Sequence, residues 1–193
     1  MVLLLKLLQN MTIEKKINKM VDFKLQPIVK IDNMDWVKEL PLSDKVCKKS
    51  LQASFPIIMN KLDQGHYIKK SKNSLIEVSI VLTDNKEICY LNNHFLGKNK
   101  PTNVLAFPLD MINIPIDSEI LVGDIVLAWE TVYEEANIQA KTVSNHLSHL
   151  VIHGFLHLLG YDHQNNDEAI KMENLEIECL SSLGIPSPYI SCN

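Results

Sequence analysis

The spacing of apolar residues predicts about four β-strands. Residues 74–83 alternate between apolar and polar positions and are rich in β-branched side chains, as strands are. Residues 101–110 and 119–129 are predicted as two further strands. A short strand is also predicted at residues 26–32, where Pro27 places it at an edge of the sheet or at its entry.

Helical periodicity separates the predicted strands. Apolar residues recur every three or four positions over residues 43–62, and Pro56 predicts a possible kink there. Residues 84–97 open with acidic and amide side chains and close on Gly97, as a capped helix does. The remaining helices are predicted at residues 130–139, 143–159 and 167–183.

Strands mixed with helices in a chain of 193 residues predict one domain of the α/β or α+β class. We expect residues 1–25 to be a peripheral N-terminal extension. The domain itself is predicted at residues 26–185, and residues 186–193 are predicted as a C-terminal tail.

The overall charge gives no sign of a nucleic-acid partner, which would need a local basic patch. The formal net charge is −4, whereas a nucleic-acid-binding domain is often basic overall. All nineteen basic residues are lysine and there is no arginine, so the planar fork that grips phosphate is missing. Any contact with phosphate must then come from lysine, backbone amides or a metal.

The composition also indicates where the protein resides. The four cysteines are scattered with no C-x-x-C pair, which argues against disulfides and thiolate zinc sites and favours a reducing compartment. The apolar start is interrupted by Lys6 and is shorter than the roughly 20 residues that span a bilayer. We therefore expect a cytoplasmic protein with no membrane segment.

The histidines carry the clearest chemical signal, because five of the seven lie in residues 146–163. His153 and His157 are four residues apart, so they share one side of a helix. Gly160 can adopt the positive φ that ends a helix, and His163 can then return over that side. The pattern H-x-x-x-H-x-x-G-x-x-H predicts a zinc site with three imidazole ligands and one open position.

Other polar residues near this segment have two interpretations each. His149 is in line with the predicted ligands and is either a proton carrier or phosphate donor in the cleft, or an ordinary packed histidine. Asp162 either fixes an imidazole tautomer or caps the next helix. The acidic side of the last helix is predicted to be solvated; it comprises Asp167, Glu168, Glu173, Glu176 and Glu178.

Gly154 stands where zinc proteases of the H-E-x-x-H class carry the glutamate that takes a proton from water. Peptide hydrolysis is therefore disfavoured. A metal that lowers the pKa of water to near 7 still serves phosphodiester cleavage, and the metal alone can act as a Lewis acid.

Three blocks of the sequence carry a family pattern: "HLSHLVIHGFLHLLGYDHQNNDEAIKMENLE" at residues 146–176, "LVGDIV" at residues 121–126, and "LNNHFLGKNKPTNVLAFP" at residues 91–108. Together they resemble the YbeY family of bacterial rRNA-maturation endoribonucleases. The similarity covers roughly residues 75–183, and the order of the blocks matches that of the family.

The resemblance implies a fold, an activity and partners. The fold is a small mixed sheet of about four strands flanked by helices, with the metal at the mouth of a cleft. One zinc ion per chain is implied on His153, His157 and His163. The implied activity is cleavage of single-stranded RNA in small-subunit rRNA 3′-end maturation and ribosome quality control. The implied partners are the 16S rRNA precursor and the small ribosomal subunit with its assembly proteins, with no DNA specificity.

The block at residues 91–108 departs from the family pattern. Leu96 follows Phe95 where the family usually has an arginine thought to hold phosphate. Lys98 matches a family lysine, and with Lys100 it either supplies the remaining positive potential or is a solvated loop residue. Three further departures are Asn99, Asn103 and Ala106. Two alternatives stay open: a ribosome-assembly factor with a structural or weakly active zinc site, and a metallopeptidase, which Gly154 makes improbable.

Overall fold

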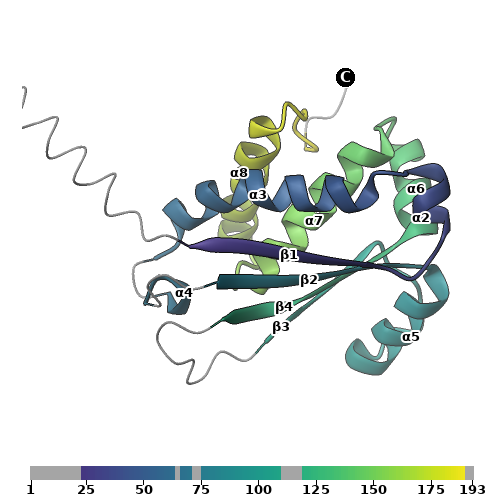
Figure 1. Cartoon of the computed structure of the whole chain (residues 1–193), viewed down its shortest axis with the longest axis horizontal. Helices are drawn as coiled ribbons and strands as arrows, with labels where there is room; N and C mark the ends of the chain where they lie inside the picture. Colours follow the sequence, from purple (N-terminus) through teal and green to yellow (C-terminus); the bar gives the residue numbers. More distant parts are fainter. Residues whose placement is uncertain (1–22, 64–65, 71–74, 110–118, 190–193) are drawn as a thin grey trace, which may run out of the picture.

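The computed structural model describes residues 23–63, 66–70, 75–109 and 119–189. Within these residues the chain forms four strands and seven helices (Figure 1), which confirms the predicted α+β class. In chain order the elements are β1 (Lys24–Ile31), α2 (Asp35–Glu39), α3 (Ser43–Lys61), α4 (Tyr67–Lys70), β2 (Leu75–Thr83), α5 (Asn85–Leu96), β3 (Val104–Pro108), β4 (Ile120–Ala128), α6 (Trp129–Ile138), α7 (Val143–Leu158) and α8 (Asn166–Ser182).

The strands form one mixed sheet in the order β1-β2-β4-β3. β1, β2 and β4 are parallel, and β3 pairs antiparallel with β4. The prediction of an edge strand around Pro27 is confirmed, since β1 pairs with β2 alone and an edge tolerates the missing N–H of proline. The mixed sheet implied by the family resemblance is therefore present, and β3 forms its other edge.

Helices cover the two faces of the sheet unequally (Figure 1). α3 and α7 pack on one face, and α8 packs against both of these helices. Alternate residues of β2 point into this main core and are fully buried; they are Ile76, Val78, Ile80 and Leu82. α5 lies on the opposite face, where Ile88 packs with Leu105 and Val126 in a smaller cluster.

Two short helices were not predicted, because five and four residues carry too little periodicity to be recognised. α2 nevertheless anchors the fold through Trp36, which is fully buried. Its indole Nε1–H donates to the carbonyl of Thr83 at 2.9 Å, and its ring meets that of Trp129 edge-on at 5.0 Å. The predicted helix around Pro56 runs unbroken as α3.

Most of the predicted extension and half of the predicted tail fall outside the described residues. Of residues 1–25, Lys24 and Leu25 open β1. Of the predicted tail, residues 186–189 are described, and Tyr189 contacts Glu176. The domain boundaries stay a prediction. Among the described helices, none has the length and apolar character that crossing a membrane requires.

Candidate functional site

The end of α7 sets the geometry of the histidine segment. Gly160 has a φ of +82°, as the sequence predicted. The Tyr161 N–H then donates to the carbonyl of Leu156 at 3.0 Å, which closes the helix end in the manner of a Schellman motif. This turn brings His163 back beside His157, with ring centroids 5.1 Å apart.

His153, His157 and His163, called the three-histidine cluster below, each offer a ring nitrogen within 4.8 Å of the other two. The Nε2 atoms of His153 and His157 are 3.1 Å apart. Two ligands of a tetrahedral zinc site with metal–nitrogen bonds of 2.0–2.1 Å lie roughly 3.3 Å apart. The donor set therefore fits a metal ion with three imidazole ligands.

The surroundings of His157 favour its neutral form. Burial lowers the pKa of His157, and the charges of His153 and His163 lower this pKa further. A neutral imidazole keeps a lone pair on one ring nitrogen, which is the form that binds a metal.

Glu176 of α8 lies directly behind the cluster. Its Oε1 accepts from Nδ1 of His153 at 2.8 Å, and its Oε2 accepts from Nε2 of His149 at 2.8 Å. The hydroxyl of Tyr189 also donates to Oε2. Burial by itself would raise the pKa of Glu176, but the hydrogen bonds and charges of His149 and His153 outweigh it and lower the pKa to about 2.

An ionised carboxylate can only accept hydrogen bonds, so the Nδ1 of His153 must donate to Glu176. This leaves Nε2 of His153 facing the cluster, as in carboxylate–histidine–metal arrangements. The prediction that Glu176 is solvated was wrong, because its exposed fraction is 0%. Its position beside Leu175 and three residues before Cys179, within the apolar stripe of α8, is the sequence signal that could have revealed this.

Of the two interpretations of His149, its position agrees with the packed histidine. It is not among the described residues that line the cleft. Its ring instead borders a separate cavity of about 210 Å³, together with Lys141, Ile185 and Pro188. The structure therefore places His149 next to Glu176, beside the segment that follows α8.

The cluster lies in a cleft of about 580 Å³. One wall is the C-terminal half of α7 with the turn at residues 160–163, and the other is β3 with the loop that follows α5. Lys98 and Lys100 line this cleft, and so does Leu96. Two cationic side chains that are remote in sequence from the histidines are thus brought to the same cavity.

Gly154 lets α7 approach the sheet. A Cβ atom at this position would lie 2.9 Å from Cγ2 of Ile125 on β4, closer than real contacts allow. The position that bears a glutamate in zinc proteases is thus occupied here by a helix–sheet contact.

Asp162 is one of the residues that line the cleft. Its carboxylate accepts from the backbone N–H of His163 and from Nε2 of Gln164, both at 2.7 Å. The hydrogen bond from the His163 backbone is the main cause that lowers the pKa of Asp162. The next helix is capped by Asn165, whose side chain accepts from the Glu168 N–H at 3.0 Å.

A buried histidine outside the three-histidine cluster links α6 to α7. His146 is 3% exposed, and its Nε2 lies 2.8 Å from Oε2 of Glu135 on α6. The same carboxylate accepts from Nδ2 of Asn103, just before β3, at 2.9 Å. Burial lowers the pKa of His146 more than the hydrogen bond raises it. We assign this trio a structural role between α6, α7 and β3.

Comparisons with known proteins identify the family of this chain. A model of the Endoribonuclease YbeY family matches residues 42–184. The Endoribonuclease YbeY of Paramagnetospirillum magneticum is 48% identical over 120 residues, covering 61% of this chain and 73% of that protein. The Endoribonuclease YbeY of Bartonella quintana is 38% identical over 161 residues, covering 83% of this chain and 94% of that protein.

Among solved structures, the solution structure of a Thermotoga maritima protein overlaps with a TM-score of 0.44 at 24% identity, covering 81% of this chain and 89% of that one. The family match, by contrast, extends over nearly three quarters of the sequence and includes the histidine segment and both walls of the cleft. The chain therefore belongs to the YbeY family of endoribonucleases.

Proposed function

We propose that this protein is a zinc-dependent endoribonuclease that cuts single-stranded RNA in the cleft. The observation that carries the proposal is the convergence of three imidazoles in a cavity that also holds Lys98 and Lys100. Relatives at 38% and 48% identity bear the name endoribonuclease, which supports RNA as the substrate.

In this proposal His153, His157 and His163 hold one zinc ion per chain. Three protein ligands leave one position open for chemistry, in contrast to a closed structural site. When bound, zinc supplies Lewis acidity toward the phosphodiester and lowers the pKa of water. Three imidazoles also suit other divalent metals, so zinc is the part of the proposal that metal analysis tests.

The remaining residues position the cluster or the substrate. Glu176 accepts the Nδ1–H of His153 and thereby keeps Nε2 of that ring directed at the metal. His149 holds Glu176 from the other side. Asp162 fixes the backbone that carries His163. Lys98 contributes positive charge to the cleft, where it attracts and orients a phosphate.

The family resemblance supports a proposal for the biological substrate. We propose that the protein acts in the cytoplasm on the 3′ end of the 16S rRNA precursor, and on small ribosomal subunits during quality control with their assembly proteins. The domain that carries this activity corresponds to the predicted residues 26–185. Support comes from the family match over residues 42–184.

A cleavage assay tests the proposal. Protein loaded with one equivalent of zinc is incubated with a labelled fragment of the small-subunit rRNA 3′ region, both single-stranded and annealed to its complement. We expect cuts in the single strand alone, with loss of cutting on chelation and recovery on zinc addition. His157→Ala, checked for folding by circular dichroism, should bind no zinc and cut nothing. Equal cutting by His157→Ala and wild type would overturn the proposal.

One observation favours a second candidate, a ribosome-assembly factor with a structural or weakly active zinc site. Leu96 lines the cleft and is 53% exposed, so an apolar side chain stands where a phosphate-binding arginine is expected in the family. Full rescue of a deletion strain by the metal-free His157→Ala variant would support this candidate over the nuclease.

A further inference from the structure

A row of aromatic rings runs along α5 and onto β3, outside the three-histidine cluster. The rings of Tyr90 and His94 lie 5.9 Å apart and nearly parallel, with 15° between their planes. His94 meets Phe95 edge-on at 4.8 Å, and Phe95 meets Phe107 of β3 at 5.0 Å. We call these four residues the aromatic row.

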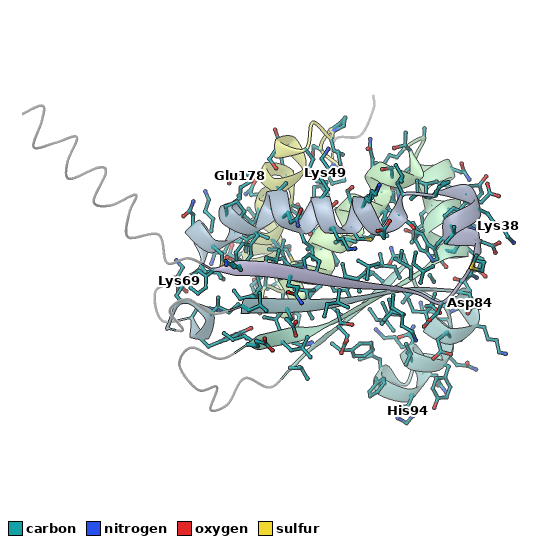
Figure 2. The ribbon with its side chains drawn as sticks, in the orientation of Figure 1. Lys38, Lys49, Lys69, Asp84, His94 and Glu178 are labelled. Atoms are coloured by element: carbon teal, nitrogen blue, oxygen red, sulfur yellow. The ribbon has the colours of Figure 1, made fainter. Side chains whose placement is uncertain are left out.

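Most of this aromatic surface faces solvent. Tyr90 is 61% exposed and Phe95 is 59% exposed. Figure 2 shows His94 on the outer side of α5, away from the layer formed by α3 and α7. Soluble monomers seldom expose contiguous apolar patches without a binding role. Cover for the small core cluster under α5 accounts for Ile88, Leu91 and Phe107, but not for the exposed rings of Tyr90 and Phe95.

The aromatic row is continuous with the cleft. Leu96 directly follows Phe95 and lines the cleft, as do Lys98 and Lys100. On β3, Ala106 and Pro108 also line the cleft, whereas Phe107 points to the opposite face of the sheet and packs in the small cluster under α5. The row and the cleft therefore meet around β3, which is the edge strand. A single strand of RNA that leaves the cleft past Lys98 and Lys100 would therefore reach the aromatic row next.

The charge around the row suits a polyanion. From residue 88 to residue 109 the chain holds no aspartate or glutamate, although the protein as a whole has a net charge of −4. By register, Asp124 of β4 lies opposite Phe107, and its side chain is half-buried. At the Tyr90 end of the row, exposed Glu87 lies one turn earlier on α5, next to Lys86. The unbalanced positive charge therefore lies at the Phe95 end, which Lys98 and Lys100 follow.

We propose that the aromatic row is a stacking platform for the bases of single-stranded RNA whose scissile segment occupies the cleft. This inference rests on the proposed function and adds where the flanking nucleotides bind. Sequence-tolerant single-strand binding combines cationic groups along the backbone with aromatic rings under successive bases. The row supplies the rings, and Lys98 and Lys100 supply the cations.

The platform makes a measurable contribution to affinity. Stacking of one base on one aromatic side chain is worth about 1–3 kcal/mol, which corresponds to about 5- to 150-fold in Kd. Because stacking releases few counterions, loss of a ring should weaken binding without changing its salt dependence. Loss of Lys98 and Lys100 should instead flatten the salt dependence.

Fluorescence anisotropy with a labelled 12-nucleotide single-stranded RNA tests the platform, using metal-free protein so that no cleavage intervenes. We expect Tyr90→Ala and Phe95→Leu each to raise Kd at least about fivefold. Leucine is chosen at position 95 rather than alanine because Phe95→Leu keeps apolar cover over Phe107. Phe95→Trp should retain affinity. Tyr133→Ala, which removes an exposed tyrosine from α6, is the matched control and should leave Kd unchanged.

A second RNA of equal length with abasic sugars separates stacking from charge. Wild type and the Tyr90→Ala variant should bind it with equal affinity. Ring variants that bind the ordinary RNA as tightly as wild type would overturn the platform and leave the row to a protein partner. The proposed nuclease would survive that result if zinc-loaded wild type still cut RNA. The proposed nuclease function, as distinct from the platform, would be overturned if wild type neither bound nor cut RNA.

Discussion

Glu176→Gln perturbs the site most selectively, because it removes one buried negative charge and keeps the size of the side chain. The wild-type carboxylate is fully buried and accepts hydrogen bonds from two imidazoles and a phenol. An amide presents two N–H donors where the carboxylate presented an oxygen. At least one buried donor then loses its acceptor.

The magnitude follows from the environment of the carboxylate. The pKa of Glu176 falls from its ordinary value of 4.5 to about 2, which corresponds to about 3 kcal/mol in favour of the ionised form. Since the folded-state pKa is below the unfolded one, this stability is present above pH 4.5 and is lost as the pH falls toward 2. We expect the free energy of unfolding of the wild type to exceed that of Glu176→Gln by about 3 kcal/mol at pH 6 and by about 1 kcal/mol at pH 3.

Urea unfolding of the metal-free proteins at the two pH values measures this difference. Zinc affinity, measured by competition with a chromophoric chelator at pH 7, should weaken about 10- to 100-fold in Glu176→Gln, because His153 loses the partner that fixes its tautomer. Glu178→Gln is the control on the same helix. Glu178 is exposed and pairs with Lys61 at 3.2 Å, so its loss should cost less than about 1 kcal/mol. Unchanged stability and zinc affinity in Glu176→Gln would refute the positioning role.

Three further predictions concern other parts of the site and core. Gly154→Ala should destabilise the protein by about 1–3 kcal/mol through overpacking on Ile125, and Ile125→Ala should relieve that penalty in a double-mutant cycle by urea unfolding; additive effects would contradict the contact. Burial raises the pKa of Cys47 to about 12, so this thiol is unreactive at pH 8. In the native protein at that pH, Ellman's reagent should label the half-buried Cys89 and spare Cys47. Fast labelling of Cys47 would count against the core described above. Leu96→Arg should tighten RNA binding about tenfold by adding a charge-assisted phosphate contact, and an unchanged Kd would show that Leu96 does not face the bound backbone.

Much of the fold could be predicted because its elements are long and periodic. The strands around residues 74–83 and 119–129 and the helix from residue 143 appear within a residue or so of the predicted ends. Gly97 and Gly160 adopt the positive φ expected at helix ends. α2 could not be predicted, since its stability comes from Trp36 packing against a residue more than ninety positions away.

The candidate site likewise has residues that local sequence predicts and residues that depend on tertiary packing. The three-histidine cluster depends on helical spacing and one glycine turn, both of which are local. Four residues advance a helix by 400°, so each step along the histidine row rotates the side chain by about 40°. His149 is therefore turned toward α8 rather than the cleft. Glu176 could not be assigned without the packing of α8 on α7, which only the tertiary structure supplies.

X-ray absorption at the zinc edge tests the central claim most directly, on protein reconstituted with one equivalent of zinc. We predict three imidazoles with nitrogen at about 2.0–2.1 Å and one additional light-atom ligand, with His157→Ala losing the signal of bound zinc. Sulfur at about 2.3 Å, or a fourth protein side chain completing the coordination, would contradict an open three-histidine site.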